Sequence, residues 1–190
     1  MTARTDALAV RLLPRSAVVD VALVIGFALV TAVAAQIRIV LPFTPVPITG
    51  TTFAVLLAGA ALGTWRGLAA MLAYVAMGLV GLPVFTGGGA GIEVLGGATG
   101  GYILGFVIAA PVVGALAQRG VDRGPVGAAA AFGLGSAIIY AFGVPVLMLV
   151  TGWGLAQALM GGVVPFLVGD AVKAGFAGVL LPVAHRLGGR

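Results

Sequence analysis

Two charged side chains, Asp170 and Lys173, stand inside an otherwise apolar run between Pro165 and Pro182, and Lys173 is the only lysine in the chain. A separation of three residues places both side chains on one face of a helix. A charge near the centre of a bilayer costs about 2.5 to 3.5 kcal/mol. A pair of them in such a run therefore predicts a functional site.

The pair combines two complementary chemistries. A carboxylate accepts hydrogen bonds from N–H groups, and an ammonium donates them to a carbonyl or carboxylate, so together they suit a neutral polar group with both functions. If Pro165 lies in the first turn of its helix, the pair lies about one to two turns below the helix end, within reach of a ligand. The alternative is a self-neutralising ion pair that only fixes helix packing.

Other chemistry is poorly represented. The chain has no cysteine, and its one histidine, His185, is expected at a helix end beside Arg186. The glycine-rich run 87–91 has no register that matches a dinucleotide fingerprint, and the lysine does not follow a glycine-rich phosphate loop. We expect no enzyme activity, no catalytic residue, no metal and no cofactor.

Composition indicates a membrane protein. Of the 190 residues, 61% are hydrophobic and 8% are charged, whereas a soluble domain carries about 25% charged residues. The 32 glycines lie within apolar runs as well as in loops, as expected for closely packed transmembrane helices. The arginines are scattered, which favours contact with membrane lipid over nucleic acid.

The expected fold is an all-α integral membrane protein, a single domain over residues 1–190. A crossing needs about 20 residues, and the apolar runs then predict a bundle of six transmembrane helices after a cytoplasmic N-terminal segment, 1–17. A short interfacial helix is allowed within 153–164. The six helices are expected at about 18–37, 50–64, 67–81, 101–118, 126–150 and 165–185.

Arginine positions predict the orientation. With six crossings, eight of the nine arginines lie on one side of the membrane and only Arg38 lies on the other. Positive residues collect on the cytoplasmic side, so both termini are expected in the cytoplasm. The eight are Arg4, Arg11, Arg15, Arg66, Arg119, Arg123, Arg186 and Arg190.

The outer side then receives three long connections, 38–50, 82–101 and the segment around Trp153, which are rich in proline and glycine. Such lengths exceed what a hairpin needs, so we expect lid loops over a cavity. Their aromatic residues are expected to form an interfacial belt, or alternatively to stack on a flat apolar ligand. These residues are Phe43, Phe85, Tyr102 and Trp153.

Small residues recur four apart at Ala28–Ala32, Gly59–Gly63 and Gly101–Gly105. This spacing lets helices approach closely. Packing inside the chain explains most such spacings, and docking of a partner helix is the alternative for Ala28 and Ala32.

Four motifs in order resemble the BioY family, the biotin-binding substrate components of energy-coupling-factor (ECF) transporters. They are Thr44-Pro-Val-Pro-Ile-Thr49, Gly78-Leu-Val-Gly-Leu-Pro-Val-Phe-Thr-Gly-Gly89, Thr99-Gly-Gly-Tyr102 and Gly169-Asp-Ala-Val-Lys173. The resemblance runs over nearly the whole chain from about residue 20.

This resemblance implies a six-helix protein of the bacterial plasma membrane that captures biotin from outside and works with a transmembrane coupling subunit and a pair of ATPases. It implies that Asp170 and Lys173 contact the ureido head of biotin, and that Ala28 and Ala32 form the docking motif on the first helix. Thr51 stands where the family commonly carries a glutamine, and is a further candidate ligand contact.

Two other functions remain open from the sequence. One is a self-sufficient secondary carrier for biotin or another small vitamin, and the other is a structural membrane subunit without a ligand. A carrier usually needs an ion site and an internal repeat, and the sequence offers no second intramembrane carboxylate; Glu93, in an outer loop, comes nearest. Homo-oligomer formation is also left open.

Overall fold

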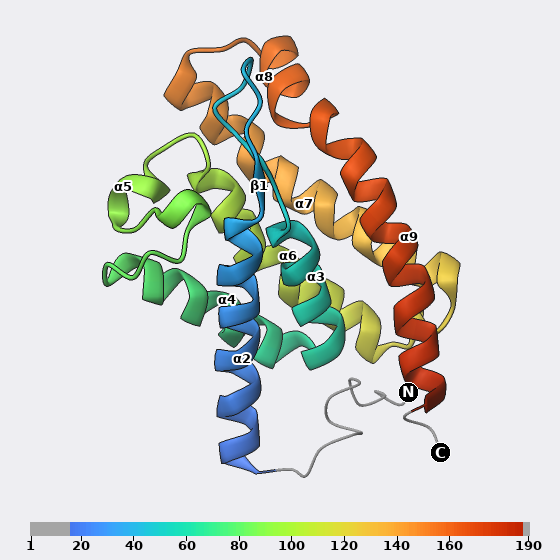
Figure 1. The fold of residues 1–190 in the computed structure, drawn as a ribbon. Helices are drawn as coiled ribbons and strands as arrows, with labels where there is room; N and C mark the ends of the chain where they lie inside the picture. The colour runs from blue at the N-terminus through green and yellow to red at the C-terminus, as the bar shows by residue number, and fades with distance from the viewer. Residues whose placement is uncertain (1–15, 188–190) are drawn as a thin grey trace.

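The computed structural model describes residues 16–187. The expected cytoplasmic segment up to residue 15 and Arg190 lie outside the described residues. The described part is mostly helical (Figure 1). Its elements are α2 (Ala17–Gln36), β1 (Arg38–Ile39), β2 (Ile48–Thr49), α3 (Thr51–Leu62), α4 (Thr64–Leu79), η1 (Thr86–Gly88), α5 (Ile92–Leu95), α6 (Gly100–Gln118), η2 (Val121–Arg123), α7 (Pro125–Thr151), α8 (Leu155–Gly162) and α9 (Val164–Leu187).

The expected count of six transmembrane helices is not confirmed. Eight α-helices are described, and four of them, α2, α6, α7 and α9, are long and apolar enough to cross a membrane. Helix α3 has 12 residues and α4 has 16, which at about 1.5 Å per residue gives about 18 and 24 Å. Both fall short of the roughly 30 Å hydrocarbon core. The structure is that of a multi-pass helical membrane protein.

Glycine and proline set where the helices end. Gly63 separates α3 from α4 with a φ of 82°, a conformation that costs glycine little. Gly120 adopts a left-handed conformation after α6, and Pro125 opens α7 in its first turn, where the missing N–H is not needed. Short turns of this kind fold α3 against α4 and α6 against α7.

Helix α6 is the centre of the bundle, since α3, α4 and α7 all pack on it, while α2 packs on α4 and α3, and α9 packs on α7. Glycines make these contacts close. A Cβ added at Gly59 would overlap the backbone of Ala110 in α6, and one added at Gly105 would lie 2.8 Å from the Ile139 Cα in α7. The small-residue spacings at Gly59 and Gly101–Gly105 therefore serve packing inside the chain.

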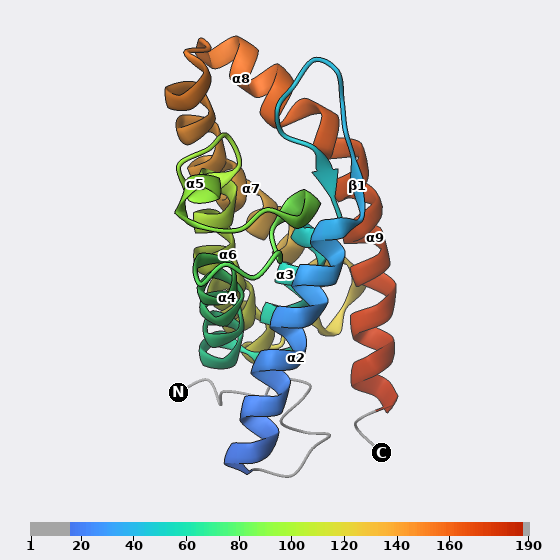
Figure 2. The ribbon, with the colours of Figure 1, turned by 60° about the vertical axis from the view of Figure 1, so that its left-hand side comes forward.

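The connections divide between two ends of the bundle (Figures 1 and 2). One end carries β1 and β2, α5 and α8, and we call it the lid end. The opposite end carries the α3–α4 turn, η2 and the last turn of α9, and we call it the arginine end. The described arginines at the arginine end are Arg66, Arg119, Arg123 and Arg186, and Arg38 is at the lid end.

The lid-end loops are tied to one another and to α2. The Gln36 Nε2 donates a hydrogen bond to the Phe85 carbonyl oxygen (3.1 Å), and the Gly88 N–H donates to the Gln36 Oε1 (3.0 Å). A Cβ added at Gly161 would meet both the Trp153 ring and the Thr44 hydroxyl. The predicted lid loops therefore form one connected cover.

Candidate functional site

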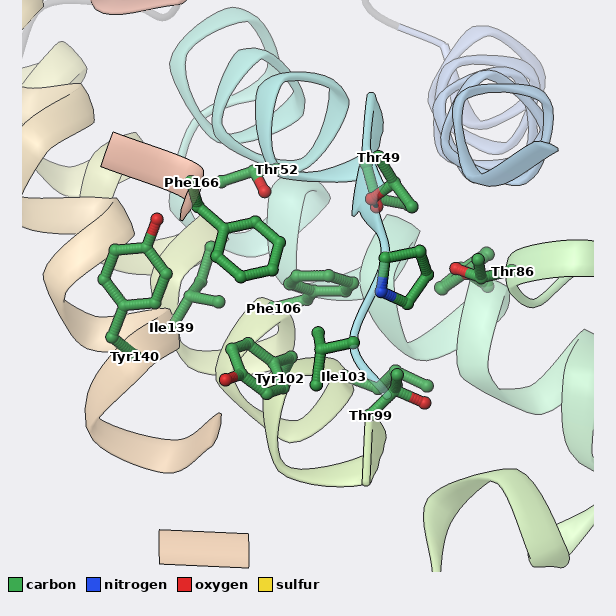
Figure 3. A pocket seen from close by; sticks show the side chains of 14 residues that line it. Thr49, Thr52, Thr86, Thr99, Tyr102, Ile103, Phe106, Ile139, Tyr140 and Phe166 are labelled. Atoms are coloured by element: carbon green, nitrogen blue, oxygen red, sulfur yellow. Dashed lines mark hydrogen bonds between the residues drawn. The ribbon is translucent and has the colours of Figure 1, made fainter. Parts of the chain in front are cut away.

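A cavity lies beneath this cover, with about 550 Å³ of unfilled space including its open mouth. Its wall is mainly aromatic and aliphatic, with threonine hydroxyls among the apolar groups (Figure 3). The lining residues are Val46, Pro47, Thr49, Thr51, Thr52, Tyr74, Thr86, Thr99, Tyr102, Ile103, Phe106, Ile139, Tyr140 and Phe166.

Asp170 and Lys173 form a hydrogen-bonded cluster with two residues of that wall. The Lys173 Nζ donates to the Asp170 Oδ1 at 3.2 Å and to the Thr49 carbonyl oxygen at 3.1 Å. The Tyr140 hydroxyl donates to the Asp170 Oδ2 at 2.5 Å. The cluster thus joins α9, α7 and β2, elements that lie far apart in the sequence.

The charged pair lies directly behind the cavity wall. Asp170 and Lys173 side chains are 11% and 19% exposed. Neither lines the cavity itself, but Thr49 and Tyr140, to which they are bonded, do. Lys173 uses two of its three ammonium N–H bonds on described residues, which leaves one donor for a ligand carbonyl. Direct contact of either charge with a ligand in this cavity therefore requires movement of a wall residue.

Two of the other predicted contacts line the cavity. Thr51 is buried at its edge, and its hydroxyl is hydrogen-bonded to that of Thr49. Tyr102 lines the wall while its hydroxyl donates to the Gly162 carbonyl oxygen at 2.9 Å. Tyr102 therefore both lines the cavity and holds the junction of α8 and α9.

Phe85 and Trp153, for which ligand stacking was the alternative to an interfacial belt, do not line the cavity. Phe85 is fully buried and packs edge-on against Tyr74, with ring centroids 5.5 Å apart. Gly78 provides the room, because a Cβ there would overlap the Phe85 ring. Trp153 borders a separate hollow next to Pro145 and covers Gly161. Phe85 thus packs the loop 80–99 against α4, and Trp153 packs against α8.

Ala28 and Ala32 are also placed differently from the expectation. They are 0% and 9% exposed and belong to the main hydrophobic core. Because α2 packs on α3 and α4 through this face, the two alanines provide close helix packing inside the chain. The expectation that they form an accessible docking stripe is wrong.

Sequence reasoning missed Tyr140. This residue lies in a long apolar helix, 30 positions before its partner Asp170. A signal was available, because the chain has only three tyrosines, and a buried tyrosine hydroxyl usually has a hydrogen-bond partner. All three, Tyr74, Tyr102 and Tyr140, line the cavity.

No metal site accompanies the cavity within residues 16–187, where groups of three or more histidine, cysteine or acidic side chains do not occur. The His185 Nε2 lies 3.0 Å from the buried Asp122 Oδ2 at the arginine end. That contact joins the last turn of α9 to η2, far from the lid end.

A partly polar cavity between helices, closed by connected loops at one end, defines a membrane-embedded binding protein for a small molecule. The chain belongs to the BioY family, whose model matches residues 4–190. It is 36% identical to the biotin transporter BioY of Rhizobium etli, covering 80% of this chain and 85% of the relative. It is 39% identical to the probable biotin transporter BioY of Pyrococcus horikoshii, with coverage of 90% and 96%.

Among solved structures, the fold is similar to a crystal structure of the S-component for biotin from an ECF-type ABC transporter. The TM-score is 0.81 at 24% sequence identity, covering 93% of this chain and 96% of the other. At this identity the comparison shows a shared fold.

Proposed function

We propose that this protein captures biotin from outside the cell as the membrane-embedded substrate-binding component of an ECF-type transporter. The observation that carries the proposal is the cavity at the lid end of a BioY-family chain, beside the Tyr140–Asp170–Lys173 cluster. Relatives with this family's sequence are named biotin transporters.

The chemistry of biotin suits this cavity. Its urea offers two N–H donors and one carbonyl acceptor, which match the Asp170 carboxylate and the spare Lys173 N–H. Its fused thioether ring is apolar, and aromatic residues such as Phe106 and Phe166 line the wall. The described residues therefore include groups suited to the polar urea of biotin and groups suited to its apolar ring.

Purified protein in detergent should bind biotin at one site per chain, measured by calorimetric titration. Lipoic acid is a suitable control, because it keeps the five-carbon carboxylate tail and a sulfur-containing ring but lacks the urea. It should not compete. Absence of biotin binding by folded protein would contradict the proposal, and equal binding of lipoic acid would contradict recognition through the urea.

A partner supplies the energy in this proposal. The only lysine, Lys173, is engaged in the cluster, so the chain has no Walker lysine with which to bind ATP. A coupling transmembrane subunit and a pair of ATPases would drive concentration of biotin. The exposed face of α2, which carries Ala22, Ile25 and Leu29 and has open space at Gly26, is the docking surface we propose.

The proposed topology has six crossings, with the arginine end in the cytoplasm. Four are formed by α2, α6, α7 and α9, and two by the shorter helices α3 and α4, whose crossings the connections 37–50 and 80–99 complete at the lid end. The chain has no cysteine, so single cysteines report sidedness directly. Glu93→Cys in intact cells should react with a membrane-impermeant maleimide, and Arg119→Cys should react only after permeabilisation. The reverse labelling pattern would mean that the lid end faces the cytoplasm.

A further inference from the structure

A second cavity at the lid end continues from the first. It shares Pro47, Thr86 and Thr99 with the main cavity and adds about 520 Å³ of space that includes open solvent. In Figure 3, Thr86 and Thr99 lie on the side of the main cavity opposite Tyr140. A ligand with its polar head near Tyr140 would therefore extend its other end toward this second cavity, which is lined in addition by Arg38, Val40, Thr44 and Pro45.

Among residues 16–187, Arg38 is the one cationic side chain that lines either cavity. Arg38 pairs with Thr49 across the β1–β2 hairpin, and the Arg38 guanidinium lies next to Gly87. A Cβ at Gly87 would overlap that guanidinium. The arginine is thus held between two lid loops, 37–50 and 80–99, at the mouth of the second cavity.

The part of the chain that the structure describes provides no counter-charge for Arg38. Within residues 16–187 its side chain makes no ion pair and no hydrogen bond, whereas Arg66 is paired with Asp20. Glu93, the acidic residue of the lid loops, is exposed on α5 and lines neither cavity. Lys173 is already bonded to Asp170 and Thr49. An anionic group in the second cavity would meet Arg38 first.

We propose that Arg38 binds the carboxylate at the tail of the ligand, opposite the head-group site. This inference rests on the proposed function, because biotin carries such a carboxylate at the end of a flexible chain that leaves its ring. A guanidinium binds a carboxylate through two parallel hydrogen bonds. The two cavities then form one elongated site, with Asp170 and Lys173 selecting the head and Arg38 selecting the charge of the tail.

The test compares biotin with biotinamide, whose tail ends in a neutral primary amide, on the purified protein and on Arg38→Gln. Loss of a charged hydrogen-bond partner should weaken biotin binding about 10- to 100-fold. Biotinamide should bind the parent more weakly than biotin and should bind Arg38→Gln and the parent alike, which also shows that the variant is folded. Arg119→Gln, which removes the same charge at the arginine end, should change neither affinity.

Three results would overturn the inference. Equal losses for biotin and biotinamide would mean that Arg38 only positions the lid loops. Unchanged biotin affinity would mean that the guanidinium serves another anion, such as a lipid phosphate. If the parent binds neither compound, the proposed function itself fails, and the tail site fails with it.

Discussion

Biotin affinity should fall at least about tenfold when Asp170 is replaced by Asn or Lys173 by Ala. A partly buried polar group that loses its partner costs about 1 to 3 kcal/mol, and more when it is charged. Asp170→Asn keeps the shape of the side chain but leaves the Lys173 ammonium without its carboxylate. Lys173→Ala removes the donor that reaches both Asp170 and the Thr49 carbonyl. Calorimetric titration of purified variants measures each loss.

Two further variants separate ligand recognition from helix packing. Asp20→Asn breaks the Arg66–Asp20 ion pair (2.8 Å) at the arginine end and should leave biotin affinity unchanged. The double variant Asp170→Asn with Lys173→Met removes both charges, so it should regain thermal stability relative to the single variants while still binding biotin weakly. If the single variants bind biotin as the parent does, the pair only fixes helix packing.

The sequence was sufficient to find this pair, because a spacing of three residues and an apolar surrounding are local properties. The rest of the cluster depends on contacts between distant segments. The Tyr140 hydroxyl reaches Asp170 from α7, and the Thr49 carbonyl reaches Lys173 from a hairpin more than a hundred residues earlier. A backbone carbonyl leaves no mark on residue type, so no sequence pattern could have identified it.

The face of α2 was unpredictable for a different reason. This helix is apolar around its whole circumference, with exposed Val21, Ile25 and Leu29 as well as buried Ala28. An amphipathic helix reveals its inner face through its polar residues, and α2 has almost none. The spacing of Ala28 and Ala32 correctly indicated a close helix contact, but it could not distinguish an internal partner from an external one.

The internal position of Ala28 changes the expected outcome of enlarging it. Ala28→Leu inserts three carbons into a site that is 0% exposed, and overpacking of this kind typically costs about 1 to 3 kcal/mol or more. We expect a lower unfolding temperature in detergent and, with it, less folded protein able to bind biotin. Thermal unfolding followed by circular dichroism, with and without biotin, measures the effect.

Larger side chains on the exposed face of α2 should have the opposite effect to Ala28→Leu, sparing stability and affecting partner docking. Ala22 is exposed, and a Cβ at Gly26 would meet nothing within 4 Å, so Ala22→Leu and Gly26→Leu should leave unfolding temperature and biotin affinity nearly unchanged. Because small residues allow close approach of a partner helix, the same variants should lose co-purification with a coupling subunit, and concentrative uptake should stop. Normal uptake by both variants would exclude this face as the docking surface, since the added side chains would then have met no partner.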